Sequence, residues 1–185
     1  MPQPSDRESS NSDPESSFPV GHGPPPIFLE HPPELLVLDV DGVLTDNTIW
    51  LDANGAEQKR FFVPDGTGIR RIQRAGVPVA LVSGRKSGVV DARAKELGIE
   101  HAYSGVIEKT PRVEAIIAAT GVRADRTVYM GDDWIDLDPM GAVGLPVAVA
   151  NAIREVKEIA IAVTTIPGGF GAVREVCDWI LLARS

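Results

Sequence analysis

Cysteine and histidine are both scarce in this chain. Among 185 residues there is one cysteine, Cys177, and the three histidines are His22, His31 and His101. A single cysteine excludes an intramolecular disulfide and a cysteine-rich zinc site, and the histidines stand at no spacing typical of a metal-binding motif. Any resident metal ion should therefore be a hard cation held by carboxylate oxygens.

Positive charge and long apolar runs are also lacking. Lys and Arg number 18 against 26 Asp and Glu, a net charge of −8, which argues against sequence-independent binding to nucleic acid or to an anionic membrane surface. No apolar run approaches the roughly 18 residues of a membrane helix, and the first thirty residues lack the apolar stretch of a secretory signal. We therefore predict a cytoplasmic protein without a nucleic-acid or membrane partner. The hydrophobic share of 43% is enough for the core of one globular domain.

The start of the chain is rich in proline and serine. Its first 33 residues contain 9 of the 15 prolines and almost no periodic apolar pattern. A segment of this kind cannot bury enough apolar surface to offset the entropy lost on ordering. We predict that residues 1–33 form a disordered tail and that residues 34–185 form the folded domain.

From residue 35 onward, short apolar runs alternate with helical stretches. Each run is too short for a core helix, as expected of strands buried on both faces of a sheet. Asp65 is a candidate helix cap, Pro111 stands near a helix start, and Gly121 follows a helix end. The alternation predicts an α/β fold with a doubly wound parallel sheet. The predicted strands cover residues 35–38, 79–82, 127–130, 147–149 and 161–163, and helices follow near Asp65, Lys86, Thr110, Asn151 and Ala172.

One insertion interrupts this alternation. Residues 48–63 contain two extended stretches around Asn54-Gly55, a pair typical of a hairpin turn, so we predict a β-hairpin between the first strand and the first helix. The insertion is too short for a lid domain.

Polar residues end the first three apolar runs. In a parallel sheet the ligand crevice lies beyond the carboxyl ends of the strands, so these residues should converge there. They are Asp39-Val40-Asp41-Gly42, Ser83-Gly84-Arg85 and Gly131-Asp132-Asp133, with Lys109 before the fourth helix.

The two carboxylates Asp39 and Asp41 are the centre of the predicted chemistry. While the backbone stays extended, side chains two residues apart project to one side, where two carboxylates repel unless a cation or a proton separates them. A carboxylate can attack phosphorus, and a second can protonate the leaving alcohol and then deprotonate water. Phosphoryl transfer also needs Mg²⁺ and phosphate donors, for which Asp132 and then Ser83 and Lys109 are the candidates.

These four motifs, in this order, resemble those of the haloacid dehalogenase (HAD) superfamily. The resemblance implies a HAD-like, Rossmann-like fold in which Asp39 is the nucleophile and Asp41 the acid/base, with Mg²⁺ bound by Asp39, Asp132 and the backbone carbonyl of Asp41. The missing cap domain, the Asn54-Gly55 hairpin, the stretch 63–70 and the tail 168–178 are similar to the family of 3-deoxy-D-manno-octulosonate 8-phosphate (KDO 8-phosphate) phosphatases. The similarity begins near residue 34 and continues to the end of the chain.

That narrower resemblance implies a set of substrate-binding residues and an assembly. A ligand with a phosphate and a carboxylate suits several cations. The family usually has Asn where this chain has Phe62, and Arg where it has Pro64. The resemblance further implies a homotetramer with shared active sites, in which hairpins meet at the centre and a neighbouring subunit helps to cover each site. The glycine-rich segment 168–171 is flexible enough to reach a neighbour's crevice, and we predict that it does. The implied substrate contacts are Asp41, Phe62, Val63, Pro64, Asp65, Gly66, Arg70, Ser83, Gly84, Arg85, Arg93 and Lys109.

Several alternatives stay open at this point. The substrate could be a related nine-carbon keto-sugar acid phosphate, or the chain could be a phosphorylatable switch or a non-catalytic oligomerisation module. A receiver-type switch places its phosphoacceptor on a later strand than its acid pair, whereas Asp39 and Asp41 follow the same run. Asp136 could support the metal site or be a charge on a helix surface, and Arg70 and Arg93 could be ordinary surface arginines.

Overall fold

A six-stranded parallel sheet forms the centre of the computed structural model, which describes residues 23–185. The strand order is β5-β4-β1-β6-β7-β8, and all five neighbouring pairs are parallel. The chain adds β4 and β5 on one side of β1 and then β6, β7 and β8 on the other side. The predicted doubly wound sheet is therefore confirmed. The strands are β1 (Leu35–Leu38), β4 (Val79–Ser83), β5 (His101–Ser104), β6 (Thr127–Gly131), β7 (Leu145–Ala148) and β8 (Ala162–Val163).

Helices cover both faces of this sheet. Right-handed crossovers place the connections to β4 and β5 on one face and the connections to β6, β7 and β8 on the other. The first group comprises α2 (Val63–Arg74) and α3 (Gly88–Leu97), against which α7 (Ala172–Leu182) packs through α2. The second group comprises α4 (Lys109–Thr120), α5 (Leu137–Gly141) and α6 (Arg154–Ile159), with short 3₁₀ turns η1 (Ala124–Arg126) and η2 (Trp134–Asp136) around β6.

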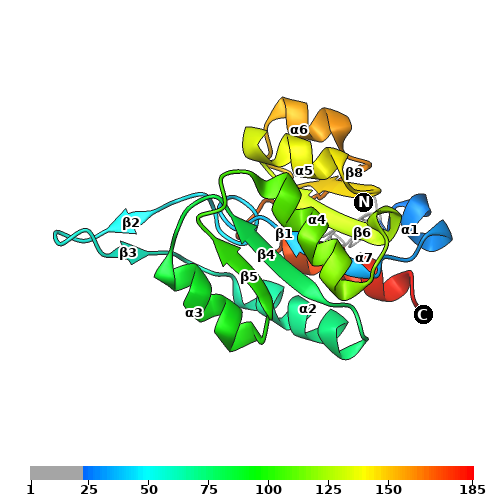
Figure 1. Ribbon diagram of the computed structural model, residues 1–185, viewed down its shortest axis with the longest axis horizontal. Helices are drawn as coiled ribbons and strands as arrows, with labels where there is room; N and C mark the ends of the chain where they lie inside the picture. The colour runs from blue at the N-terminus through cyan, green and yellow to red at the C-terminus, as the bar shows by residue number, and fades with distance from the viewer. Residues whose placement is uncertain (1–22) are drawn as a thin grey trace, which may run out of the picture.

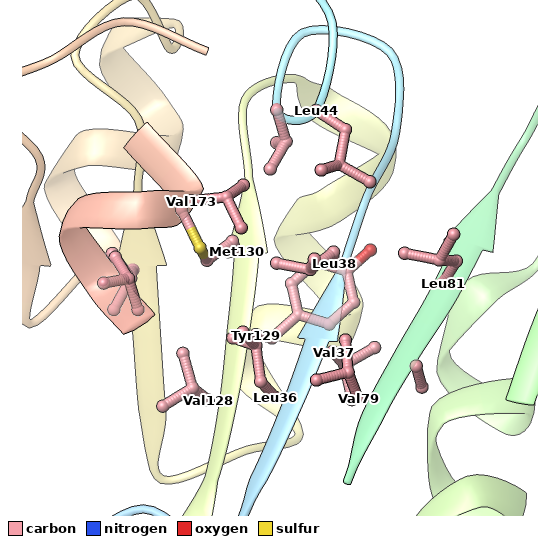
Figure 2. Packing of buried hydrophobic residues seen from close by; sticks show 14 of the residues in the cluster. Leu36, Val37, Leu38, Leu44, Val79, Leu81, Val128, Tyr129, Met130 and Val173 are labelled. Atoms are coloured by element: carbon pink, nitrogen blue, oxygen red, sulfur yellow. The ribbon is translucent and has the colours of Figure 1, made fainter. Parts of the chain in front are cut away.

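The hydrophobic core lies on both faces of the central strands. All four residues of β1 are buried, which explains why this strand reads as an unbroken apolar run. Figure 2 shows side chains of β1, β4 and β6 packed together, with Leu44 from the loop after β1 above them and Tyr129 among them. Tyr129 is the largest fully buried side chain of the described residues.

The hairpin insertion extends away from the sheet. Strands β2 (Trp50–Leu51) and β3 (Glu57–Gln58) pair antiparallel and project from the body of the molecule (Figure 1). The turn is closed by Asp52, whose carboxylate accepts hydrogen bonds from the backbone N–H groups of Asn54 and Ala56 at 2.8 Å. The predicted hairpin is therefore present, with shorter strands than expected.

Three details differ from the sequence prediction. Strand β5 was not predicted, because it lies at the edge of the sheet and its half-buried residues form no apolar run. Asp65 does not cap α2, since the helix starts at Val63 and the Asp65 carboxylate accepts the backbone N–H of Arg174 instead. The helix expected after Asn151 starts three residues later, at Arg154.

The predicted disordered tail is wrong for its last part. Residues 26–30 form helix α1 (Pro26–Glu30), whose Phe28 is fully buried and meets the Trp179 ring of α7 edge-on at 6.4 Å. Arg126 and Arg184 donate hydrogen bonds to the carbonyls of Pro32 and Pro33. One aromatic anchor is enough to dock a proline-rich segment that has no apolar periodicity. Residues 1–22 lie outside the described residues.

None of the helices within residues 23–185 is long and apolar enough to cross a membrane.

We predict that Phe28→Ala lowers the free energy of unfolding by about 3 kcal/mol, because it removes a buried aromatic side chain and leaves a cavity against α7. Leu29→Ala on the same helix is the control, since Leu29 is 58% exposed and should change stability little. Denaturant unfolding of the two variants measures the difference. Equal stability of both would mean that α1 contributes nothing to the fold.

Candidate active site

The carboxyl ends of β1 and β6 bring three acidic side chains together. The chain adds strands to one side of β1 first and to its other side afterwards, so the order of the strands reverses at β1. In such sheets a crevice lies beyond the carboxyl end of the strand at which the order reverses. Asp39 follows β1, while Asp132 and Asp136 follow β6, and one carboxylate oxygen of each lies within 4.8 Å of the others. All three residues are buried. Asp136, which the sequence left undecided, belongs to this cluster.

A buried lysine holds the cluster together. Lys109 is the first residue of α4 and is 2% exposed. Its Nζ donates to Asp39 Oδ1 at 2.6 Å and to Asp136 Oδ1 at 2.7 Å. This ammonium therefore fixes the orientation of the Asp39 carboxylate.

Both oxygens of Asp136 are occupied by donors from the protein. Besides Lys109, Oδ1 accepts the Tyr129 hydroxyl at 2.8 Å, and Oδ2 accepts the backbone N–H of Asp132 at 3.0 Å and of Asp133 at 3.3 Å. The Asp136 side chain also packs tightly against the backbone of Gly131, because a Cβ at Gly131 would lie 2.5 Å from Asp136 Cβ. Asp136 is thus suited to position Lys109 and the loop carrying Asp132 rather than to bind a metal ion itself.

Burial and mutual repulsion favour protonation of the other two carboxyls. Burial, reinforced by Asp136, raises the pKa of Asp39 to about 7, against the opposing effect of Lys109. Burial, with Asp39 and Asp136, likewise raises the pKa of Asp132 to about 8. For Lys109, burial disfavours the ammonium, but the two neighbouring carboxylates outweigh it and hold the pKa above its usual range.

The charges of this cluster suit a divalent cation. If all three carboxylates ionise, they and the Lys109 ammonium carry a net charge of −2, which one bound Mg²⁺ would balance. Gly42 leaves space at this place, because a Cβ there would lie 1.9 Å from Asp132 Oδ2. Asn47 donates to the same Asp132 oxygen at 3.3 Å. Asp39 and Asp132 therefore fit the oxygen donor set of a magnesium site.

Asp41 lies in a turn and not on an extended strand. Strand β1 ends at Leu38, and the carbonyl of Val40 accepts the N–H groups of residues 43, 44 and 45. The extended backbone on which the sequence argument for Asp39 and Asp41 depended therefore does not continue to Asp41. Each carboxylate has its own lysine, because Asp41 Oδ1 binds Nζ of Lys59 whereas Asp39 binds Lys109.

The second motif adjoins the same edge of the sheet. Ser83 ends β4 and is fully buried, with its hydroxyl donating to the carbonyl of Arg85 at 3.2 Å. A Cβ on Gly84 would lie 3.3 Å from Ile135 of η2, so this turn borders the loop after β6. The exposed Arg85 side chain follows directly.

The stretch Phe62–Gly66 begins beside the crevice and continues into α2. The Phe62 ring lies 3.4 Å from the Cβ position of Gly171, whereas Val63 is 73% exposed. Pro64 occupies the first turn of the helix, where its missing N–H costs no hydrogen bond. Asp65 is buried with its Oδ2 unpartnered, and burial raises its pKa to about 6.

Arg93 lies near this stretch, but Arg70 does not reach the crevice of its own chain. The Arg93 guanidinium lies over the Phe61 ring, 5.4 Å from its centroid. Arg70 donates to the carbonyl of Glu96 at 2.6 Å and lines a cavity of about 660 Å³ with the residues that start β4 and β5. This is the opposite end of the strands from Asp39. Arg70 also lines a groove between α2 and α3 with Val63, Gly66 and Arg93, so the structure brings these four predicted contacts together, but Asp39 does not line this groove.

The glycine-rich segment 168–171 belongs to its own crevice. A Cβ on Gly168 would lie 1.7 Å from the Gly42 carbonyl oxygen, and Gly169 N–H donates to the Val43 carbonyl at 3.0 Å. The Asn151 side chain also accepts the Gly168 N–H at 2.7 Å. The backbone of this segment is therefore held against the loop after β1 of its own chain, and contact with a neighbour's crevice stays a prediction.

Two residues of the site were missed in the sequence. Lys59 and Asn47 contact Asp41 and Asp132 from the insertion and from the loop before it. Asn47 has a φ of 63°, a conformation that asparagine tolerates better than most residues, so its identity was an available signal. No pattern pointed to Lys59, since a lone lysine after a strand is usually exposed.

Comparison with known proteins agrees with this geometry. A family model for haloacid dehalogenase-like hydrolases matches residues 102–167. The 3-deoxy-D-manno-octulosonate 8-phosphate phosphatase of Yersinia pestis is 44% identical over 150 residues, covering 81% of this chain and 80% of the relative. Its crystal structure superposes with a TM-score of 0.83 at 42% identity, over 85% of each chain. The Moraxella catarrhalis phosphatase of the same name, solved with magnesium, phosphate and KDO, gives a TM-score of 0.81 at 36% identity, over 85% of this chain and 90% of that one.

We predict that Asp65 makes stability fall as the pH rises. Its pKa is about 6 in the fold against 3.8 ordinarily, so the fold prefers the protonated form. The stabilising contribution is complete below about pH 4 and is lost as the pH rises through about 6, a loss of about 2–3 kcal/mol. Asp65→Asn cannot ionise and still accepts the Arg174 N–H.

Urea unfolding at pH 4 and at pH 7.5 measures this effect. The stability of Asp65→Asn relative to the wild type should rise between the two pH values. Glu114→Gln, on the exposed surface of α4, is the control and should show no such change. A pH-independent difference for Asp65→Asn would contradict the prediction.

Proposed function

Because this chain belongs to the 3-deoxy-D-manno-octulosonate 8-phosphate phosphatases, a family of haloacid dehalogenase-like hydrolases, we propose that it is a Mg²⁺-dependent phosphomonoesterase that releases phosphate from KDO 8-phosphate. The observation that carries the proposal is the buried Asp39–Lys109–Asp136 network beside Asp132 at the ends of β1 and β6. This network fixes one carboxylate at a site suited to a divalent cation and to phosphate. The cytoplasmic location expected from the sequence stays a prediction.

Asp39 is the proposed nucleophile. Its carboxylate attacks phosphorus, and the bond to the leaving alcohol breaks to give an aspartyl phosphate. Lys109 holds Oδ1 of Asp39 at 2.6 Å, which fixes the carboxylate before the substrate arrives and avoids reorganisation during the reaction. Mg²⁺ bound by Asp39, Asp132 and the Asp41 carbonyl would neutralise the charge that otherwise repels the two anions.

Asp41 is the proposed acid/base. It gives a proton to the leaving oxygen of the sugar and later takes one from the water that hydrolyses the aspartyl phosphate. Its side chain is 22% exposed, so it borders the open part of the crevice where substrate and water enter. The buried Asp39 is not so placed, which supports this division of roles.

Binding of the phosphate is assigned to Ser83, Gly84 and Lys109, and binding of the sugar acid to Arg85 and the stretch Phe62–Gly66. Ser83 lies at the end of β4, the neighbour of β1 in the sheet. Arg85 follows as an exposed cation that can meet the carboxylate or the phosphate of the ligand. Pro64 supplies no charge where relatives usually have Arg, so the remaining cations carry more of the recognition.

We propose a homotetramer whose subunits share substrate-binding residues. Arg70 lines the groove between α2 and α3 with Val63, Gly66 and Arg93, and also the cavity at the amino ends of β4 and β5. Asp39 lines neither of them, so Arg70 is better placed to meet a sugar bound at Asp39 of a neighbouring copy than one bound in its own chain. The projecting hairpin supplies a surface for that contact, since Trp50 and Leu51 are 65% and 68% exposed.

We predict that the purified protein releases phosphate from KDO 8-phosphate only with Mg²⁺, and that Asp39→Asn lowers kcat by about 10⁴-fold or more because the nucleophile is lost. A phosphate-release assay on KDO 8-phosphate, a nine-carbon keto-sugar acid phosphate and a hexose phosphate measures both rate and preference. Asp125→Asn, an exposed carboxylate paired with Arg123, is the control. Near wild-type turnover by Asp39→Asn would refute the mechanism, and preference for the nine-carbon ester would correct the substrate.

We predict that mixing two inactive variants restores activity if sites are shared. Asp39→Asn chains keep Arg70, and Arg70→Ala chains keep Asp39, so random mixed oligomers should contain intact sites in about a quarter of positions. Coexpression followed by an activity assay tests this, with light scattering to verify that a tetramer forms. Each variant alone should stay weakly active or inactive. A mixture no more active than the average of its components would exclude sharing of Arg70.

A further inference from the structure

Lys59 joins the base of the hairpin to the active-site loop. It lies directly after β3, and its side chain is 0% exposed. Its Nζ binds Asp41 Oδ1 and lies 3.0 Å from Glu57 Oε1, close enough for an ion pair but without hydrogen-bond alignment. A buried ammonium is thus shared between the hairpin and the loop after β1.

This arrangement is not required for folding the hairpin. A buried lysine is costly unless it is paired, and replacing a buried ion pair by apolar side chains is often neutral or stabilising. The hairpin itself is closed by Asp52 and by the β2–β3 pairing, neither of which involves Lys59. Lys59 has two carboxylate partners, and Asp41 is the one that lies in the crevice. The positive charge of Lys59 therefore acts on Asp41.

We propose that Lys59 is a positioning residue for Asp41 in the phosphatase reaction, an inference that rests on the proposed function. By occupying Oδ1, the ammonium confines the exchangeable proton of Asp41 to Oδ2 and restricts the rotation of the carboxyl group. Asp41 then gives that proton to the leaving oxygen as the phosphorus–oxygen bond breaks, and regains one from the attacking water. Lys59 neither gains nor loses a proton. Lys109 has the corresponding role at Asp39.

The leaving group distinguishes this role from a merely structural one. The alkoxide of a sugar phosphate is a strong base that must be protonated as it leaves, whereas p-nitrophenolate leaves without a proton. Loss of the Asp41 orientation should therefore slow the first turnover of the sugar phosphate and spare that of p-nitrophenyl phosphate. The ratio of the two rates in one sample does not depend on the folded fraction.

Rapid-quench measurement of the first turnover with KDO 8-phosphate and p-nitrophenyl phosphate tests the proposal. Lys59→Met should lower the rate with the sugar phosphate by about 10- to 100-fold and that with p-nitrophenyl phosphate by no more than about threefold. Lys59→Gln is the second variant, in case the methionine variant is not recovered. Lys95→Met removes an exposed lysine of α3 and should change neither rate.

The reference is Asp41→Asn, which should show the same selective loss. If Lys59→Met and Lys59→Gln slow both substrates equally, or neither, while Asp41→Asn is selective, the role of Lys59 is refuted and the proposed function stands. If Asp41→Asn is not selective, the acid role of Asp41 fails and the role of Lys59 fails with it. Absence of Mg²⁺-dependent turnover in the wild type would overturn the proposed function itself.

Discussion

The ion pairs of Lys109 with Asp39 and Asp136 are the interaction on which the site depends. They connect the first residue of α4 to the residues that follow β1 and β6, so one buried ammonium joins three elements that are distant in sequence. Removing either partner would leave an uncompensated charge in a buried place, which is far more costly than the pair is stabilising. The same contacts orient Asp39 and, through Asp136, the backbone that carries Asp132. Stability of the loops and geometry of Asp39, the proposed nucleophile, are therefore consequences of one network.

The site is built at a cost in stability. Burial raises the pKa of Asp39, Asp132 and Asp65, so each of these carboxyls opposes folding when it is ionised. Such groups would be replaced by apolar residues if packing alone decided the sequence. A divalent cation at Asp39 and Asp132 would offset part of this cost by adding favourable charge where the protein supplies too little. For Asp65, burial outweighs the Arg174 N–H and the charges of Arg93 and Arg174, all of which favour the ionised form.

Residues 23–185 contain no cap domain, so in the proposed assembly neighbouring copies would help to cover the crevice. The crevice over Asp39 is bordered by residues 168–171 and by the hairpin base, both from the same chain. Arg70 lies in the groove between α2 and α3, and the apolar hairpin residues Trp50 and Leu51 are largely exposed, so these residues are available to the proposed neighbouring copies. Lys59 links the hairpin to the crevice, because it follows β3 and binds Asp41, the proposed acid/base.

The sequence by itself determined the fold class, the positions of the buried strands along the chain and the motif residues at their ends. Apolar runs such as Leu35–Leu38 and the polar residues after them are local features that the parallel-sheet rules convert into positions. Only the tertiary structure decided which charges meet. Lys59 and Asp41 are 18 residues apart and Lys109 and Asp39 are 70 apart, and no periodicity encodes such pairs. The same holds for Arg70, which the helix pattern placed correctly on α2 but which packing turned toward α3. It holds also for Phe28, whose docking depends on Trp179 near the end of the chain. Local patterns reflect backbone preferences and burial, whereas contacts between distant residues exist only once the elements have packed.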